Sequence, residues 1–158
     1  MRSPVVTCSV GSDLNHAAEL MWDHDCGVVP VVDDQGRLAG IVTDRDVCMA
    51  AYTQGGTLRS IPVRSAMASH VLVCHLNDSL TLAEELMREG QVRRVPVIDD
   101  EGRPIGIISM SDLARLADRA RKNAVDREIV QTLSAVSMPR QQTETAKAEE
   151  PARRIPVV

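Results

Sequence analysis

The chain has 158 residues, of which 44% are hydrophobic and 25% charged, and its formal net charge is −4. This length and composition allow one or two domains with a buried core. With no phenylalanine, one tryptophan and one tyrosine, the chain lacks the aromatic platforms and the basic field that nucleic-acid-binding proteins use. No run of about 18 apolar residues occurs and the N-terminal residues turn polar early, so we expect no membrane span, no secretory signal and a cytoplasmic location.

The first 52 residues predict five elements in the order β-α-β-β-α. Residues 3–8 (SPVVTC) read as a short apolar strand, and a polar break separates them from an amphipathic helix with Leu14, Ala17 and Met21 on one face. The runs VVPVV and LAGIV follow, joined by DDQG, which is typical of a hairpin turn. A second helix is expected to begin at Thr43.

The same order returns 66 residues later. Residues 69–74 (SHVLVC) match the first strand, RVPVI and PIGII match the hairpin around DDEG, and a helix is expected from Ser109. Between residues 1–46 and 67–112, 19 of 46 aligned pairs are identical without a gap, whereas chance would give about one in sixteen. The sequence therefore predicts an α+β fold made of two tandem β-α-β-β-α repeats, over residues 1–52 and 67–118.

Three further segments complete the expected organisation. Residues 53–66 are expected to link the repeats, with RSIPV as an extended lead-in strand to the second repeat that the first repeat lacks. Residues 119–138 continue the helical pattern to about Val136, and residues 139–158 lack apolar periodicity, which predicts a disordered tail. Because the tail ends in IPVV, the alternative is that it fills the lead-in place of the first repeat.

The stretch GIVTDRD, residues 40–46, has two competing interpretations. In one, Thr43 caps a helix and Asp46 bonds back to it, which is close to capping-box spacing. In the other, both hold a ligand, because a helix start offers free N–H groups to phosphate and a carboxylate accepts two hydrogen bonds from a ribose diol. Gly40 and Gly106 would leave room for a ligand near the backbone. The two roles are compatible, and recurrence of the pattern in the second copy favours ribose binding.

The two copies together resemble the CBS domain pair, the regulatory module named after cystathionine β-synthase. The resemblance covers residues 1 to about 118. It rests on VPVVDD and VPVIDD, on Gly36, Gly40, Gly102 and Gly106, and on the pairs Thr43/Asp46 and Ser109/Asp112. It implies pseudo-twofold symmetry with two clefts between the repeats and dimerisation into a flat disc of four repeats. It also implies binding of adenine nucleotides or related adenosyl compounds, with the signal passed to a partner protein.

This resemblance assigns a ligand set to each cleft. Ribose would bind Thr43 and Asp46 in one and Ser109 and Asp112 in the other. The stretch VRRVPVIDDEGRPIGIISMSD resembles the nucleotide site of the gamma subunit of AMP-activated protein kinase, which makes the second-copy set the better furnished. The implied phosphate ligands are Arg45, Arg93, Arg94 and Ser111, and the implied adenine slot is Val5, Val6, Thr7, Val71, Leu72 and Val73.

Each assignment has a plainer alternative. Arg93 and Arg94 would otherwise mark a solvated strand end, and the first strands would otherwise pack in the core. AMP is the first choice of ligand, with ATP, ADP, NAD and S-adenosylmethionine as the other candidates.

The sequence contains no catalytic-triad order, P-loop or GxGxxG motif. We therefore expect a protein that is not an enzyme, and we expect no bound metal. Zinc is the alternative, since Cys8 and Cys74 occupy matching positions and His24 lies two residues from Cys26, but four converging ligands are not evident. Widely spaced cysteines predict free thiols; they are Cys8, Cys26, Cys48 and Cys74. Two hypotheses remain: a nucleotide-sensing regulatory homodimer with an unknown effector protein, and an interaction or scaffold module whose clefts are empty or hold a metal.

Overall fold

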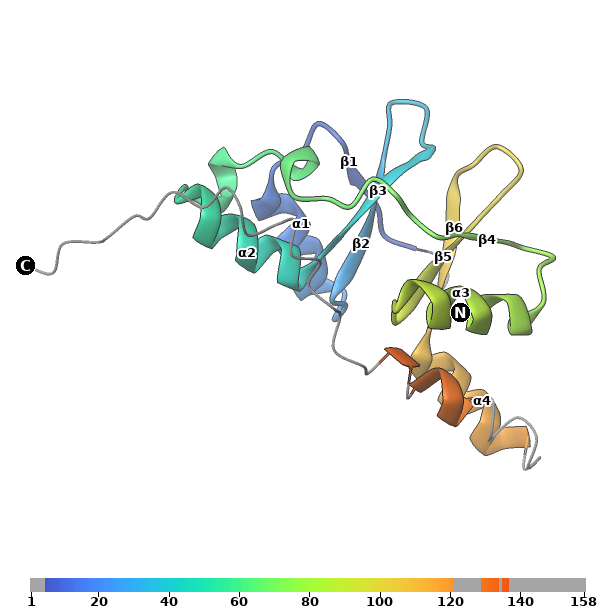
Figure 1. Cartoon of the computed structure of the whole chain (residues 1–158). Helices are drawn as coiled ribbons and strands as arrows, with labels where there is room; N and C mark the ends of the chain where they lie inside the picture. The colour runs from blue at the N-terminus through green and yellow to red at the C-terminus, as the bar shows by residue number, and fades with distance from the viewer. Residues whose placement is uncertain (1–4, 121–128, 134, 137–158) are drawn as a thin grey trace, which may run out of the picture.

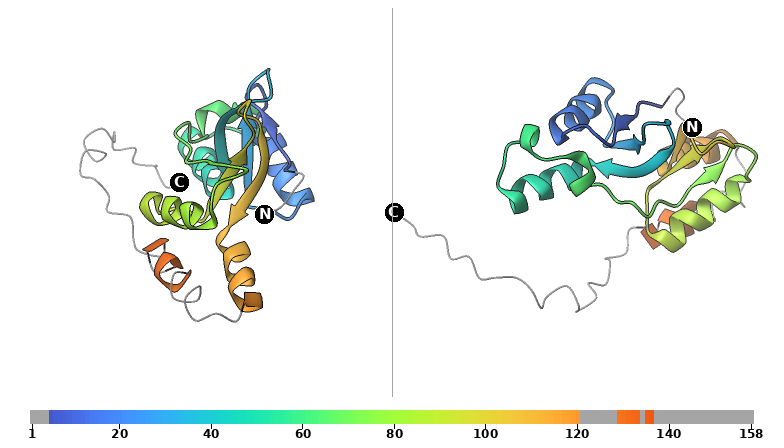
Figure 2. Two further views of the ribbon diagram at one scale, coloured as in Figure 1. Left: turned by 90° about the vertical axis from the view of Figure 1, so that its right-hand side faces the viewer. Right: turned by 90° about the horizontal axis from the view of Figure 1, so that it is seen from above.

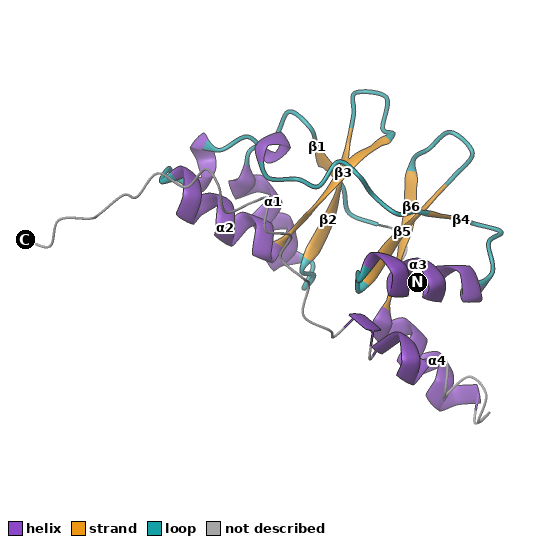
Figure 3. Ribbon diagram, viewed as in Figure 1, coloured by secondary structure: helices purple, strands orange, loops and turns teal. Residues whose placement is uncertain are grey.

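The computed structural model of the chain describes residues 5–120, 129–133 and 135–136. The first repeat consists of β1 (Cys8–Ser9), α1 (Leu14–Asp23), β2 (Val28–Val32), β3 (Leu38–Thr43) and α2 (Asp44–Gln54). The second consists of β4 (Cys74–His75), α3 (Leu80–Gly90), β5 (Arg94–Ile98), β6 (Pro104–Ser109) and α4 (Met110–Ala120). Two small sheets stand side by side, with α1 and α2 beside one and α3 and α4 beside the other (Figures 1 and 3). The predicted β-α-β-β-α order is confirmed in both repeats.

Both repeats build the same three-stranded sheet. The first strand pairs in parallel with the second, and the second pairs antiparallel with the third. The registers coincide at an offset of 66 residues, since Val28 faces Thr43 and Arg94 faces Ser109. The first strands are shorter than expected, because β1 and β4 have two residues each. Residues 5–7 and 69–73 precede them without joining the ladder, and several of these residues line cavities instead.

The Asp-rich turns explain why each hairpin closes where it does. Asp33 Oδ1 accepts a hydrogen bond from the backbone N–H of Arg37 at 2.9 Å, and Asp99 makes the matching bond in the second hairpin. Backbone hydrogen bonds hold the pKa of both carboxyl groups below its usual value. Gly36 and Gly102 have φ angles of 77° and 81°, in the left-handed region that favours glycine.

The two hairpins contact each other reciprocally. The side chain of Arg103 lies beside Gly36, and that of Arg37 lies beside Gly102. In addition, the N–H of Leu38 donates to the carbonyl of Gly102 at 2.9 Å. Such exchange of equivalent contacts is what a twofold relation between two repeats requires, and the view from above in Figure 2 shows the strands between the two pairs of helices.

The linker packs on the first repeat rather than leading into the second. Within residues 53–66 the chain forms short 3-10 helices at Leu58–Ser60 and Val63–Ser65, not the expected lead-in strand. Ile61 and Val63 are buried in the first core, the carbonyl of Ile61 accepts a bond from Leu14 N–H, and Val63 N–H donates to the Ser12 carbonyl. The first repeat therefore does not lack this segment, because its own linker supplies it.

Helical residues after α4 supply the matching segment of the second core. Ile129 and Val136 are 4% and 7% exposed and pack with Met87 and Leu113. These residues therefore complete the second core, as Ile61 and Val63 complete the first. The predicted tail over residues 139–158 lies outside the described residues.

The repeats are joined along the edge of β3. Ile41 and Ala68 exchange backbone hydrogen bonds of 3.0 and 2.9 Å. This pairing brings the chain against Gly40, where an added Cβ would lie 2.8 Å from both the carbonyl oxygen of Ala68 and the sulfur of Met67. The space that Gly40 provides is therefore filled by the protein itself, which corrects the expectation that it is kept for a ligand.

Candidate ligand-binding site

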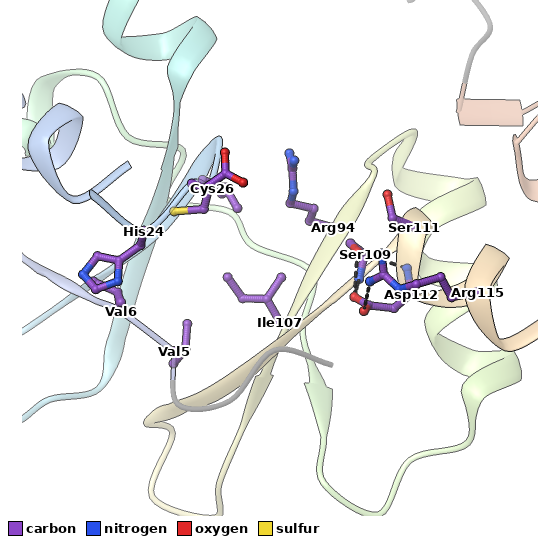
Figure 4. A pocket seen from close by; sticks show the side chains of 12 residues that line it. Val5, Val6, His24, Cys26, Arg94, Ile107, Ser109, Ser111, Asp112 and Arg115 are labelled. Atoms are coloured by element: carbon purple, nitrogen blue, oxygen red, sulfur yellow. Dashed lines mark hydrogen bonds and ion pairs between the residues drawn. The ribbon is translucent and has the colours of Figure 1, made fainter. Parts of the chain in front are cut away.

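A cavity of about 290 Å³ lies between the two repeats, and Figure 4 shows its two walls. The first repeat contributes the chain before β1 and the α1–β2 connection, while the second contributes β5, β6 and the start of α4. The residues from the first repeat are Val5, Val6, His24, Asp25, Cys26 and Val28. Those from the second are Arg94, Ile107, Ser109, Ser111, Asp112 and Arg115. A cavity that combines apolar side chains with a few convergent polar groups is typical of a small-molecule site.

Ser109 and Arg115 hold the carboxylate of Asp112 in this cavity. Its Oδ2 accepts hydrogen bonds from the backbone N–H and the hydroxyl of Ser109, at 2.9 and 2.6 Å. Its Oδ1 accepts a bond from Nη2 of Arg115 at 2.6 Å. Burial raises the pKa of Asp112, but the bonds from Ser109 and Arg115 outweigh it and bring the pKa to about 2. The group is therefore a charged acceptor at neutral pH.

The lowered pKa of Asp112 leads to a prediction about acid stability. An aspartate in an unfolded chain titrates near about 3.9. A folded-state pKa of about 2 therefore stabilises the fold above the unfolded value, and this contribution is lost as the pH falls toward 2. We expect Asp112→Asn to lower the free energy of unfolding by about 1–2 kcal/mol near pH 7 and by much less near about pH 2.5.

Urea unfolding of both proteins at the two pH values measures this difference. Asp100→Asn, in an exposed turn position, is the control and should change stability little at either pH. Losses of equal size at both pH values would contradict the assignment of a low pKa to Asp112.

The first repeat has the same carboxylate arrangement. Oδ2 of Asp46 accepts from the N–H and the hydroxyl of Thr43 at 2.9 and 2.7 Å, and Asp46 N–H donates to the Thr43 hydroxyl at 3.2 Å. These bonds form a complete capping box at the start of α2. The capping interpretation of GIVTDRD is therefore correct, and it leaves a ligand role open because one carboxylate can do both.

The structure brings part of the expected ligand set together. Arg94, Ser109, Ser111 and Asp112 line one cavity with Val5 and Val6. By contrast, Arg93 and Thr7 do not line it. The carbonyl of Arg93 accepts the N–H of Met110 at 3.0 Å, so its backbone helps to start α4. Thr43, Arg45 and Asp46 also lie outside this cavity, as the resemblance implied for the other cleft.

The segment before β4 packs differently from the matching segment before β1. Leu72, one of the expected adenine neighbours, lies so close to Gly90 that an added Cβ there would collide with it. The matching positions in the first cavity are Val6 and His24, which both line open space. Val71 and Val73 line a separate cavity of about 460 Å³ near Asp33. The two repeats therefore differ at these matching positions, because Leu72 packs against Gly90 whereas Val6 and His24 line the cavity.

The sequence did not predict several of the cavity residues as ligand neighbours. His24, Asp25 and Cys26 follow α1, and Asp25 has a left-handed φ of 46°, which re-aims the chain into the cavity. The sequence did indicate them, because the 66-residue offset pairs residues 24–26 with residues 90–92, which lie directly before the predicted phosphate ligands Arg93 and Arg94. Arg115 also had a signal, since it follows Asp112 by three helical positions and residues at that spacing meet on one helix face.

Two of the four cysteines, Cys8 and Cys74, are core residues. All four are free thiols, as expected. Cys8 and Cys74 are buried in separate cores, and burial raises the pKa of both. Among the residues that the structure describes, no three His, Cys, Asp or Glu side chains lie close enough to hold a metal ion.

Nor does the described part of the chain contain a helix long and apolar enough to cross a membrane.

Two duplicated units that enclose a cavity of this kind define a two-repeat ligand-binding module. The chain belongs to the CBS domain family, whose model matches residues 1–52 and 63–119. Proteins built on such a pair are generally regulatory and non-catalytic. This confirms the resemblance and the fold class that the duplicated motifs predicted.

Two curated relatives match most of their own length. The CBS domain-containing protein YhcV of Bacillus subtilis is 37% identical over 114 residues, which cover 72% of this chain and 79% of that protein. Hypoxic response protein 1 of Mycobacterium tuberculosis is 34% identical over 136 residues, which cover 85% of this chain and 89% of that protein.

Solved structures share the fold. The crystal structure of Hypoxic Response Protein I with two coordinated zinc ions has a TM-score of 0.66 and 32% identity, covering 73% of this chain and 92% of that chain. The CBS domain pair of protein MJ0100, in complex with 5′-methylthioadenosine and S-adenosyl-L-methionine, has a TM-score of 0.68 and 25% identity, covering 77% and 94%. Members of this fold therefore hold different small ligands.

Proposed function

We propose that the chain is an adenine-nucleotide-sensing regulatory module whose ligand binds in the cavity between the repeats. The observation that carries the proposal is the ionised carboxylate of Asp112, held by Ser109 in a cavity that Val5 and Val6 also line. A fixed carboxylate is suited to a ribose diol, and an apolar slot is suited to a base. AMP is the first candidate, followed by ATP, ADP, NAD and S-adenosylmethionine.

The roles of the lining residues follow from their chemistry. Ser109 and Asp112 take the ribose, Arg94 and Ser111 take a phosphate, and Val5 and Val6 flank the base. Arginine and hydroxyl groups are common phosphate partners. The adenosyl compounds in the MJ0100 structure, a 25% identical neighbour, support this ligand class. Thr43, Arg45 and Asp46 would serve a weaker second cleft.

The output of the module would pass through other protein surfaces. We place the chain in a cytoplasmic homodimer, a disc of four repeats, which signals to an effector protein. Trp22 on α1 and Tyr52 on α2 are 86% and 82% exposed, although aromatic side chains of this size are usually buried in cores or interfaces. Their exposure supports a partner on the helical face of the first repeat.

The alternative is a scaffold whose clefts are empty or hold zinc. The two zinc ions of Hypoxic Response Protein I favour it. Against it stands the lack of a metal-ligand cluster among the residues described here.

Thermal unfolding separates these functions. Purified protein is heated with AMP, ADP, ATP, NAD, S-adenosylmethionine or zinc. At 100 times its dissociation constant, a ligand adds about 2.7 kcal/mol to the stability of the folded state, which raises Tm by several degrees. We expect the largest increase with an adenine nucleotide. An increase with zinc alone, or none with any adenosyl compound, would contradict the proposed function.

A further inference from the structure

Arg115 occupies the wall of the cavity beside the carboxylate that we assign to the ribose. Its Nη2 donates to Oδ1 of Asp112 at 2.6 Å, and the two side chains are 62% and 18% exposed. Both residues lie in α4 at i,i+3 spacing, at which helical side chains meet. Figure 4 shows them together at the cavity, with Ser109 on the other side of the carboxylate.

This ion pair lies at the oxygen that a ribose needs. A carboxylate oxygen has about two acceptor positions, and Oδ2 of Asp112 already accepts two bonds from Ser109. A ribose diol must therefore approach Oδ1, where it meets the guanidinium of Arg115. The ribose can be fully bound only when Arg115 gives up part or all of its contact with Asp112.

A displaced Arg115 would still border the ligand. Its side chain is long and mostly exposed, so it can reorient without disturbing the core. A guanidinium binds phosphate oxygens in a bidentate manner, and Arg94 and Ser111 line the same wall. An anionic ligand therefore gives the guanidinium a new partner, whereas a neutral ligand breaks the ion pair without replacing it.

The first repeat provides a natural comparison. Asp46 has the same bonds from Thr43 as Asp112 has from Ser109, but the residue three positions further on is Met49. The covering arginine therefore distinguishes one cleft from the other. Arg115→Met is the corresponding substitution, and it keeps a long unbranched side chain of high helix propensity.

We propose that Arg115 determines the charge class of the ligand. It covers the ribose acceptor of the empty cavity and turns to the phosphate of a bound ligand, so anionic adenosyl compounds bind in preference to neutral or cationic ones. This inference rests on the proposed function and adds to it the discrimination between AMP, adenosine and S-adenosylmethionine.

Isothermal titration of the full chain with AMP and with adenosine tests the inference. In Arg115→Met, we expect AMP to bind about threefold more weakly or worse, and adenosine as tightly as before or more tightly. The AMP-to-adenosine affinity ratio should then fall at least about threefold. S-adenosylmethionine should bind Arg115→Met more tightly than it binds the wild type, because a positive charge is removed from the cavity wall.

Two further variants serve as controls. Arg64→Met removes the same charge from an exposed position away from the cavity and should leave the ratio within about twofold of wild type. Arg115→Lys keeps the charge and should restore part of the ratio.

A ratio in Arg115→Met within about twofold of wild type would overturn the inference, whether the two affinities stay unchanged or fall together. Failure of the proposed function is distinguishable, since wild-type protein would then bind neither AMP nor adenosine nor S-adenosylmethionine. That result would remove the basis of the inference as well.

Discussion

Asp112→Ala is expected to weaken AMP binding by about 30-fold or more. The substitution removes the acceptor for both ribose hydroxyls, and a hydrogen bond to a charged group contributes about 1.5–3 kcal/mol. A combined loss of about 2–4 kcal/mol corresponds to about 30- to 1,000-fold in Kd. Calorimetric titration at neutral pH measures the change directly, where Asp112 is fully ionised because its pKa is about 2.

Asp46→Ala is the matched control for this experiment. It removes the matching side-chain bonds that Thr43 donates to Asp46 in the first repeat, so both variants should lose about 1 kcal/mol of stability as the capping box is broken. Asp46 does not line the cavity between the repeats, and we expect the AMP affinity of this variant to stay within about threefold of wild type. If Asp112→Ala bound AMP as wild type does, or if both variants lost affinity equally, the ribose would not lie at Asp112.

Gly40→Ala is expected to lower the free energy of unfolding by about 1–3 kcal/mol, the usual effect of overfilling a packed site. The added Cβ would lie 2.8 Å from the carbonyl oxygen of Ala68, and that carbonyl also accepts the N–H of Ile41 at 3.0 Å. Because the obstacle is backbone, relief requires the pairing of the repeats to shift. Urea unfolding followed by circular dichroism gives the stability.

Gly11→Ala is the control, since its Cβ would meet Ser9 Oγ at an ordinary 3.7 Å and the site is exposed. We expect its stability to stay within about 0.5 kcal/mol of wild type. Equal stabilities of the two alanine variants would show that β3 and the residue 67–68 segment are not held together as described.

The fold was predictable because the duplication and the local chemistry agree. The 66-residue offset fixes the equivalence of the hairpins, the Asp33 and Asp99 turns close on their own backbone, and the Thr43 cap starts α2 where the pattern places it. Each of these features depends on residues within a few positions of one another. For the same reason Ser109 and Asp112, three residues apart, could be predicted to act together.

The walls of the cavity were harder to predict, because they depend on contacts between distant segments. Nothing local shows that Val5 faces Ser109, or that Ile61 packs back onto the first repeat. The packing of Leu72 against Gly90 is likewise a contact between segments that lie 18 residues apart in the sequence. Arg93 and Arg94 could not be told apart either, because the sequence does not show that β5 begins at Arg94, so that Arg94 reaches the cavity and Arg93 precedes the strand.

Amide chemical-shift mapping with AMP tests most directly whether an adenosyl ligand occupies the cavity between the repeats. Saturating AMP is expected to move the amide signals of Val5 and Val6 together with those of residues 109–112. Signals of Gly11 and His16, which line a separate surface hollow, should stay in place. No shift at saturating AMP, or shifts confined to Gly11 and His16, would contradict ligand binding between the repeats.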